Sequence, residues 1–556
     1  MRNIIIVECR STGINFIEDI INRGYNPVVL EVNYGDSETG IDYKEAVHKE
    51  YNEIKHHFDL IYEKDTYEET LEEVRKWDPL LILPGNEKGV RLASQLAHDL
   101  KLKCNPIENL DAMTLKSEMQ KRIAEHGLRS IRGKVVRTAE EAIEYYETEN
   151  LKNVVLKPIY GASSAGIEMC STKEEITEYM NKLTSKTNSF GEHLHEIIIQ
   201  ERIDGDEYIV NTVSCEGKHR VTLIWKYTKI RTPEGNILYE ACETVDELDI
   251  SEAEMVEYAY SVADAIGIQY GPVHGEYMID EKGPVLIEVN CRPCGGHMYT
   301  EFLDEISGQH ETDSILDSYL KPEYFNNQMK QPYKLFAHGA LKFFNTPHEI
   351  LAVASPIKNI NMKLKSHYST MLEVTDNQIF IKTEDLESGC GITFLVNKDY
   401  RQLKKDLTFL RHVEKYAFSL ILTEKRDTDK NYVSNTEEFI EGLYDYGTGL
   451  IITDEPINTD LMQVSPKNLD DTGNQFDFII FNLNNSLKEN DIESLITLLS
   501  KSFKKVKTGG VIHIPESTYD IFPNGRRGME ALIKACNFKI EVPPYNIKNS
   551  IIASKK

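Results

Sequence analysis

Short apolar runs separated by amphipathic stretches open the chain and predict alternating strands and helices. Runs at 4–7, 27–32 and 80–83 have the length of buried strands. Isoleucines at helical spacing follow the first run over 14–21. Strands separated by helices indicate a parallel, doubly wound sheet, so we expect an α/β domain over residues 1 to about 108.

The turn after the first run has the sequence Ser11-Thr12-Gly13. Backbone N–H groups at the start of a helix can bind an anion. The spaced glycines of a dinucleotide-binding loop are missing, so a plain connection between strand and helix is the alternative.

From about 109 to 425 the pattern changes to that of an α+β domain. The expected helices and strands are Ala112–His126, Glu140–Glu149, Lys173–Leu183, Val154–Lys157, Ile197–Gln200, Tyr208–Val213 and Val221–Trp225. A charged linker is expected over Thr423–Ser434. Further apolar runs at 450–452, 476–483 and 511–514 predict another α/β domain over 426–556.

Composition places the chain among ordinary globular proteins. Of its 556 residues 40% are hydrophobic and 28% charged, and roughly three or four domains fit that length. The net charge of −27 argues against nucleic acid or a membrane surface as partner. Apolar runs are too short for a signal peptide or a membrane span, and nine scattered cysteines suit a reduced compartment. We therefore expect a cytoplasmic protein.

Residues 274–290 predict a β-hairpin around Glu281-Lys282-Gly283. Gly283 stands where a three-residue loop needs a left-handed residue, which would pair Asp280 with Pro284. Glu276 then faces Glu288, and His274 faces Asn290. The residues expected on the opposite, buried face are Tyr277, Ile279, Val285, Ile287 and Val289.

Two carboxylates facing each other at roughly 5 Å repel. A hard divalent cation removes that repulsion, and Asn290 adds an amide oxygen on the same face. Oxygen ligands without thiolate suit Mg²⁺, which takes further ligands from water and phosphate. A solvated hairpin face that happens to carry two glutamates is the alternative.

Phosphate-binding candidates precede the hairpin. Lys157 ends an apolar strand, and a small-residue loop with Gly161, Ser163, Ser164 and Gly166 follows it. Such loops let backbone N–H groups approach phosphate oxygens, although this one is not a Walker A loop. A flexible surface turn is the alternative, and Lys116 taken alone would be a solvated helical lysine.

Residues 200–208 end a strand in an acidic turn, Gln-Glu-Arg-Ile-Asp-Gly-Asp-Glu-Tyr. A backbone segment of this kind can bind an adenine edge, and the carboxylate of Glu207 can reach ribose hydroxyls. Taken alone the signal is weak, because acidic turns are common.

In this order and spacing, Lys116, Lys157 with its loop, the 200–207 segment and the 274–297 segment resemble the ATP-grasp superfamily. The ending Asn-x-Arg-Pro-x-Gly-Gly-His is most similar to carboxylate–amine ligases that act on L-amino acids. The resemblance covers residues 1 to about 425. It implies a domain preceding the ATP-grasp fold, then a small subdomain over about 109–198 and a large one over about 199–425.

The resemblance also implies a role for each matching residue. ATP would be bound by Lys116, Lys157, Gly161, Ser163, Ser164, Gly166, Gln200, Glu201, Ile203, Glu207 and, with less support, Lys226. Two Mg²⁺ ions, or Mn²⁺, would be held by Glu276, Glu288 and Asn290. Arg292 and Lys157 would be catalytic, and His274, Arg292, Gly295 and Gly296 would contact the substrates.

The implied activity is ATP-dependent activation of a carboxylate as an acyl phosphate, followed by attack of an amine. Small-molecule substrates, most simply amino acids, would be the partners, with a homodimer compatible but not indicated. Alternatives are a thiol or carrier-bound acceptor, or a nucleotide-binding scaffold without catalysis. Arg292 argues against the scaffold, because binding alone does not need it.

Two features fall outside this resemblance. Cys291, Cys294 and His297 suggest a redox pair or half a zinc site, with a structural or substrate-lining role as the favoured alternative. Residues 476–515 are similar to the second half of class I methyltransferases, with a Lys-Thr-Gly-Gly turn expected before the last strand. The glycine loop that would bind S-adenosylmethionine is missing, so we expect a relic used for packing or partner contacts, or a site for another ligand.

Overall fold

The computed structural model describes the residues that form the regular elements and most of their connections. These are residues 1–34, 47–49, 51–52, 54–159, 167–183, 196–232, 236–346, 350–351, 364–372, 379–386, 388–412, 449–453, 462–472, 475–483, 492–515, 529, 533, 538–540 and 550–555. The chain divides into two compact units, Met1–Ala340 with Glu384–Glu387, and Leu341–Thr383 with Ser388–Lys556. Among the described residues, no helix is long and apolar enough to cross a membrane.

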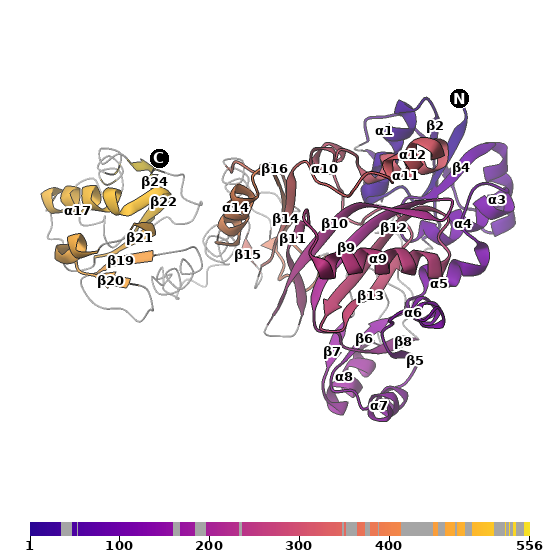
Figure 1. Cartoon of the computed structure of the whole chain (residues 1–556), viewed down its shortest axis with the longest axis horizontal. Helices are drawn as coiled ribbons and strands as arrows, with labels where there is room; N and C mark the ends of the chain where they lie inside the picture. Colours follow the sequence, from indigo (N-terminus) through magenta and orange to yellow (C-terminus); the bar gives the residue numbers. More distant parts are fainter. Residues whose placement is uncertain are drawn as a thin grey trace. The chain divides into compact units, whose positions relative to one another are not determined.

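A four-stranded parallel sheet opens the first unit, in the order β3-β2-β1-β4. Two of its strands, β2 and β4, are labelled in Figure 1. Its elements are β1 (Asn3–Val7), η1 (Ser11–Ile14), α1 (Asn15–Asn22), β2 (Asn26–Glu31), β3 (Asp59–Tyr62), α3 (Tyr67–Lys76), β4 (Pro79–Pro84) and α4 (Gly89–Asp99). The three predicted strands are confirmed. Ile4 to Val7 are fully buried in the central strand, where each apolar side chain contributes about 1.5–3 kcal/mol.

The Ser11-Thr12-Gly13 turn packs closely against other backbone. A Cβ atom on Gly13 would lie 2.2 Å from the carbonyl oxygen of Gly85, so the turns after β1 and β4 pack directly on each other. The Thr12 hydroxyl donates to the carbonyl oxygen of Gly296 and accepts from the N–H of Met298. The turn therefore holds the 291–299 loop, which supports the plain-connection alternative.

A helix predicted over 112–126 is two helices, α5 (Leu110–Thr114) and α6 (Lys116–Glu125). Leu115 between them is extended, with φ −109° and ψ 118°. Because of this break, Lys116 is the first residue of α6. Its side chain therefore points in a different direction from the side chain of a lysine in the middle of a continuous helix. A short η2 (Ile107–Asn109) precedes α5.

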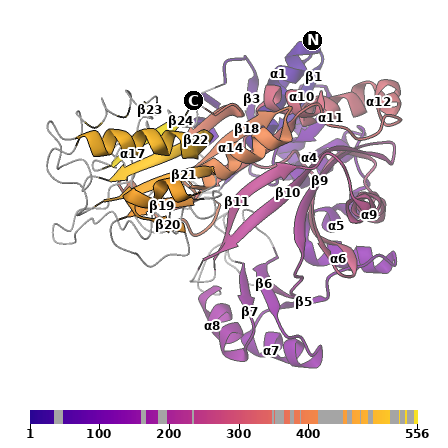
Figure 2. The same cartoon turned by 60° about the vertical axis from the view of Figure 1, so that its left-hand side comes forward.

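An antiparallel sheet follows, in the order β5-β8-β6-β7. It contains β5 (Gly133–Val136), β6 (Val154–Pro158), β7 (Glu168–Cys170) and β8 (Ile197–Glu201), with α7 (Ala139–Thr148) and α8 (Lys173–Leu183) on one side (Figure 2). The side chain of Thr138 caps α7 by accepting from the N–H of Glu141. The predicted helices and strands of this region are confirmed to within a residue or two.

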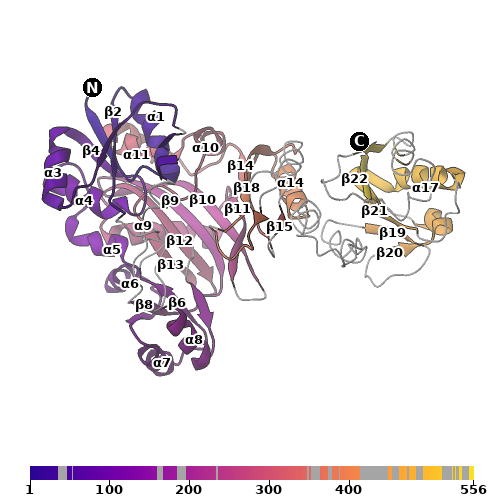
Figure 3. The same ribbon diagram turned by 180° about the vertical axis from the view of Figure 1, so that it is seen from behind.

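A larger antiparallel sheet runs β13-β12-β9-β10-β11-β14 (Figure 3). Its elements and those that follow are β9 (Asp206–Cys215), β10 (Lys218–Arg231), β11 (Ile237–Thr244), α9 (Ile250–Ile266), β12 (Tyr270–Asp280), β13 (Gly283–Asn290), α10 (Thr300–Ser307), α11 (Glu311–Leu320), α12 (Pro322–Gln328) and β14 (His338–Phe344). A capping box of Asp249 and Glu252 starts α9, and left-handed Gly267 ends it. This helix covers one face with a buried apolar cluster, so the other face is the one on which a site can form.

The second unit contains two groups of elements. The first comprises β15 (Ile350–Leu351), β16 (His367–Leu372), β17 (Ile379–Phe380), β18 (Gly391–Asn397) and α14 (Tyr400–His412). The second comprises β19 (Gly449–Thr453), β20 (Met462–Val464), η5 (Pro466–Asp471), β21 (Phe476–Asn482), α17 (Ile492–Lys505), β22 (Val506–Pro515), β23 (Phe538–Ile540) and β24 (Ser550–Lys555). Its sheet has the order β20-β19-β21-β22-β24-β23, with β24 antiparallel to both neighbours.

The three strands predicted near the C-terminus are confirmed, but the turn expected at Gly509-Gly510 is not. These residues lie inside β22, where the pairing with β21 passes from Val506 to Val511 through an irregularity. The residues of β22 between Val506 and Val511 outnumber those on β21, and they form a local shift in register instead of a separate turn. The expected linker at 423–434 lies outside the described residues, and the domain boundaries at 108 and 425 remain predictions.

Candidate active site

The β12–β13 hairpin places the two predicted carboxylates opposite each other. Glu276 pairs with Glu288, and His274 pairs with Asn290, as predicted. The turn itself differs, because Asp280 pairs with Gly283 and the loop holds only two residues. Gly283 has the expected positive φ, +95°.

A bulge restores the register that the shorter loop would have changed. The pairing shifts between Glu276 and Tyr277, so that Tyr277 faces Leu286 and Ile287 is the extra residue. Leu286 is fully buried in place of Ile287, which is only partly buried. The predictions that Ile287 is buried and that Val285 lies on the face opposite Glu276 were therefore wrong, because Val285 pairs with Met278, two residues from Glu276. The shorter loop and the bulge nevertheless cancel before Glu288 is reached.

The charges around this pair are unevenly distributed. The Nζ of Lys116 lies 3.0 Å from Oε2 of Glu288. Burial and, after it, the facing carboxylate of Glu288 raise the pKa of Glu276 to about 7. Burial also opposes ionisation of Glu288, but the ammonium groups of Lys116 and Lys157 outweigh it and lower the pKa of Glu288. Lys157 is itself buried, which lowers its pKa to about 8.

This arrangement fits a magnesium site. Glu276, Glu288 and Asn290 lie on one face of the hairpin and offer carboxylate and amide oxygens. A divalent cation between the two carboxylates would remove their mutual electrostatic repulsion. Asn290 is close enough for its Nδ2 to lie 3.4 Å from Oε1 of Glu288.

Arg292 follows the hairpin and contacts the turn after β4 of the N-terminal sheet. Its Nε lies 3.4 Å from Oε2 of Glu87, and its Nη1 donates to the carbonyl oxygen of Pro293 at 2.9 Å. Burial raises the pKa of Glu87, although Arg292 and Lys116 act against it. Glu87 was missed from the sequence. Its position after β4, at the carboxyl edge of a parallel sheet where ligands usually bind, was the available signal.

Lys226 does not reach this site. It pairs with Tyr208 across β10 and β9, and its Nζ lies 2.6 Å from Asp206 and 5.1 Å from the Tyr208 ring centroid. Side chains alternate along a strand, so Lys226 is on the α9 face of the sheet.

Lys229, three residues further along β10, is on the site face. Its Nζ lies 2.6 Å from Oε1 of Glu207, and Glu207 shares that face with Glu276. The rings of Tyr227 and Tyr239 lie 5.2 Å and 4.4 Å from the same nitrogen. Lys229 therefore replaces Lys226 among the candidate cations.

This difference predicts unequal effects of the same substitution at the two lysines. Lys229→Met removes a buried cation beside Glu207 and Glu276, and we expect kcat/KM for ATP to fall roughly 10–100-fold. Lys226→Met is the matched control on the opposite face, and it should change kcat/KM for ATP less than about threefold. Initial rates at varied ATP concentration measure both. A larger loss of kcat/KM in Lys226→Met than in Lys229→Met would contradict the placement of Lys229 on the site face.

The residues predicted to bind the adenine ring lie at the end of β8, an inner strand of the smaller sheet, and just after it. The Gln200 side chain is buried, and its Nε2 has no protein partner among the described residues. The carboxylate of Glu201 pairs with Arg132 at 2.8 Å, and its N–H donates to the carbonyl oxygen of Arg132 at 2.9 Å, so neither group is left for an adenine edge. Ile203 is partly buried. The loop of Gly161, Ser163, Ser164 and Gly166 lies outside the described residues.

The predicted substrate contacts surround Arg292. His274 is buried and shares a 2.8 Å hydrogen bond between its Nδ1 and Oδ1 of Asn211. Burial and, after it, the Arg292 guanidinium lower the pKa of His274 to about 3, so the ring is neutral. Gly296 has φ +71°, and a Cβ atom there would meet nothing within 4 Å, whereas Gly295 lies near the Arg292 guanidinium.

Cys291 and Cys294 are both buried thiols. Burial raises the pKa of Cys294 to about 12 and that of Cys291 as well, which disfavours the thiolate that redox or zinc chemistry needs. The structural or substrate-lining alternative is the one that this environment supports.

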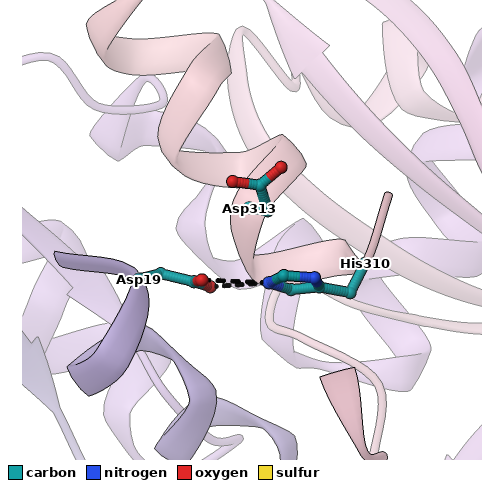
Figure 4. Close-up of side chains that lie close together, drawn as sticks. All are labelled: Asp19, His310 and Asp313. Atoms are coloured by element: carbon teal, nitrogen blue, oxygen red, sulfur yellow. Dashed lines mark hydrogen bonds and ion pairs between the residues drawn. The ribbon is translucent and has the colours of Figure 1, made fainter. Parts of the chain in front are cut away.

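A second charged cluster lies between α1 and α11, and Figure 4 shows three of its members. Nε2 of His310 lies 3.0 Å from Asp19, and its Nδ1 lies 2.8 Å from Asp304. Arg23 forms ion pairs with Asp313 and with Asp317. Asp19, His310 and Asp313 have a spacing that a cation could use, but Arg23 and His310 already neutralise the carboxylates. We interpret this α1–α11 ion cluster as structural.

The α1–α11 ion cluster predicts a pH-dependent stability. Burial alone lowers the pKa of His310, but Asp19 and Asp304 outweigh it and raise the value from 6.5 to about 10. The stabilisation is therefore complete below about pH 6.5 and is lost as the pH rises through about 10. We expect His310→Gln to reduce the free energy of unfolding by roughly 3 kcal/mol near neutral pH, and by less as the pH approaches 10.

Urea unfolding at several pH values measures this difference, with His98→Gln as the control because His98 is exposed on α4. If His310→Gln reduces the free energy of unfolding by the same amount over the whole pH range, the positive charge of His310 contributes nothing to stability.

Known proteins share parts of this architecture. A model of the ATP-grasp domain family matches residues 151–301. Dapdiamide A synthase of Enterobacter agglomerans is 26% identical over 361 residues, which is 64% of this chain and 84% of that protein.

Solved structures agree in fold. The L-amino acid ligase from Bacillus licheniformis superimposes with a TM-score of 0.57 at 15% identity, covering 74% of this chain and 97% of that one. A carboxyaminoimidazole ribonucleotide synthase from Aspergillus clavatus, complexed with ATP, gives a TM-score of 0.54 at 11% identity over 74% and 98% of the two chains. The order of motifs predicted from the sequence, the family match and the common fold lead to one conclusion: the chain contains an ATP-grasp domain, matched over residues 151–301.

Proposed function

We propose that this protein is an ADP-forming ligase that activates a carboxylate as an acyl phosphate and joins it to an amine. The observation that carries the proposal is the facing pair Glu276 and Glu288, with Lys116, Lys157 and Arg292 around it. Phosphoryl transfer depends mostly on positioning and charge neutralisation, and these are the required groups.

Bound ATP and Mg²⁺ would supply the phosphoryl group and neutralise part of its charge. Glu276, Glu288 and Asn290 would hold the metal, with two ions as the family resemblance implies. Lys116 and Lys157 would contact phosphate oxygens, and Glu207 with the 200–203 segment would bind the nucleoside. The substrate carboxylate attacks the γ-phosphorus and ADP leaves. The amine then attacks the acyl carbon, phosphate leaves, and the amine loses a proton.

Arg292 would act on the charge that develops during both steps. Its guanidinium offers several N–H donors to an acyl phosphate or to the oxyanion of the tetrahedral intermediate. Glu87 holds the group from the N-terminal sheet and so orients it. His274, neutral and fixed by Asn211, would present Nε2 to the same region.

Amino acids are the proposed substrates. The names of the relatives support this choice: one is a dapdiamide synthase and one fold neighbour is an L-amino acid ligase. A thiol or a carrier-bound acceptor would use the same activating machinery, and the test below includes it.

The C-terminal sheet supports a second, separate proposal. Its order, with the antiparallel β24 inserted between β22 and β23, is the arrangement that we expect of a methyltransferase-like domain. We infer a packing or partner-binding role for it, since the sequence lacks the glycine loop for S-adenosylmethionine.

The proposal is tested by measuring ADP release with pooled amino acids, with and without Mg²⁺. The molecular mass of the product is determined by mass spectrometry. Thiols and carrier-bound acceptors are offered in parallel. Amino-acid-dependent ADP release that needs Mg²⁺ and yields an amide is the expected result. Nucleotide binding without any acceptor-dependent turnover would instead favour a scaffold.

A further inference from the structure

A small cavity lies on the site face of the large sheet, beside Arg292. Its walls include Asn211, Trp225, Cys294, Met298 and Glu311. It offers about 10 Å³ for the centre of a water-sized group, which is about the room that one water molecule or one ammonium group needs.

Most polar groups on the wall are already paired within the protein. Asn211 shares a hydrogen bond with His274, and the hydroxyl of Ser307 donates to the carbonyl oxygens of Leu303 and Gln309. Gln309 donates to Asp313 and accepts from Arg220.

Glu311 is different. Its side chain is buried, with the residue 5% exposed, and its Oε2 accepts from the N–H of Cys294 at 2.9 Å. Its Oε1 is buried without a hydrogen-bond partner among the described residues. A carboxylate oxygen left unmatched beside a cavity costs free energy unless a donor fills the space.

The strand register fixes where this cavity lies relative to the metal carboxylates. Asn211 is two residues beyond Ile209 on β9, and Ile209 pairs with Glu276. Two residues along a strand correspond to about 7 Å on the same face. Burial raises the pKa of Glu311 to about 7, and the N–H of Cys294 and the Arg292 guanidinium act against that rise, so the cavity and the proposed acyl phosphate share this arginine.

We propose that Glu311 binds the α-ammonium group of the amino acid whose carboxylate is activated. This deepens the proposed function and rests on it. One carbon separates the ammonium and carboxylate groups of an α-amino acid, which suits a carboxylate-binding region at Arg292 and a cation site directly beside it. The apolar walls formed by Trp225 and Met298 lower the local dielectric constant and so strengthen the ion pair.

The assignment also separates the roles of the two amines in the reaction. A carboxylate beside the amine of the activated amino acid keeps it protonated, so it has no lone pair to donate. The second substrate, whose amine must be deprotonated, would bind elsewhere.

Binding measurements on the whole protein test this proposal without relying on turnover. Thermal shifts in the presence of Mg²⁺ and ATP are measured for L-alanine, L-leucine and L-phenylalanine, each paired with the acid that lacks the amine: propanoate, isocaproate and hydrocinnamate. We expect at least one amino acid to bind the wild type much more tightly than its paired acid. In Glu311→Gln that amino acid should bind roughly 30-fold more weakly or worse, with the paired acid unchanged.

Gln keeps an oxygen that accepts from the N–H of Cys294, so the 291–299 loop should stay in place. Glu305→Gln, an exposed change on α10, is the matched control and should bind all ligands as the wild type does. In Glu311→Gln, an equal loss of affinity for the amino acid and for its paired acid, or no loss of affinity for either, would overturn the assignment. A missing shift with Mg²⁺ and ATP alone would count against the proposed function instead.

Discussion

Glu288→Gln is expected to lower the rate of ADP formation at least about 1,000-fold while the protein stays folded. The change keeps the shape of the side chain and removes the charge that faces Glu276 and contacts Lys116. A metal held by Glu276 and Asn290 alone would lack one of its two anionic ligands. Glu276 remains as a counter-ion for Lys116 and Lys157, so the melting temperature should change little.

Glu281→Gln is the matched control, because Glu281 lies exposed in the turn of the same hairpin. It should retain wild-type activity. Initial rates of ADP release and thermal unfolding of both variants measure the effect. Full activity in Glu288→Gln would remove this residue from the metal site.

Arg292→Ala is expected to lower kcat about 100–1,000-fold and to change KM for ATP less than about threefold. The guanidinium is placed to bind charge that develops on the substrate, not the nucleotide that is bound beforehand. Its removal leaves Glu87 buried without its ion pair, so a modest loss of stability is expected as well.

Arg292→Lys separates charge from geometry. A lysine keeps the cation but loses the planar fork of donors, so we expect partial recovery only. Steady-state kinetics at varied ATP and amino-acid concentrations give both parameters. An increase in KM for ATP with unchanged kcat would place Arg292 at the nucleotide instead.

The hairpin illustrates how far the sequence could predict this site. Alternation of apolar residues and the position of Gly283 were sufficient to bring Glu276 opposite Glu288. The loop length was wrong, because a two-residue turn with a bulge and a three-residue turn without one give the same register at that point. Only backbone coordinates distinguish the two solutions.

Other contacts depend on tertiary packing that no local pattern encodes. Lys226 and Lys229 are both plausible lysines on one strand, and only the pairing of β9 with β10 decides which faces Glu207. Glu87 and Glu311 come from turns and helices distant in sequence from the motifs that they contact. The strands themselves were predictable because their burial leaves short, mainly apolar runs in the sequence, as at 4–7 and 476–483.

The most direct test of the account is a crystal structure grown with Mn²⁺ and a non-hydrolysable ATP analogue, with the metal located by anomalous scattering. The account predicts an ion between Glu276 and Glu288, about 2.0–2.2 Å from an oxygen of each and bound to the triphosphate. An ion bound instead at Asp19, His310 and Asp313, or a triphosphate located away from Lys116 and Lys157, would contradict it.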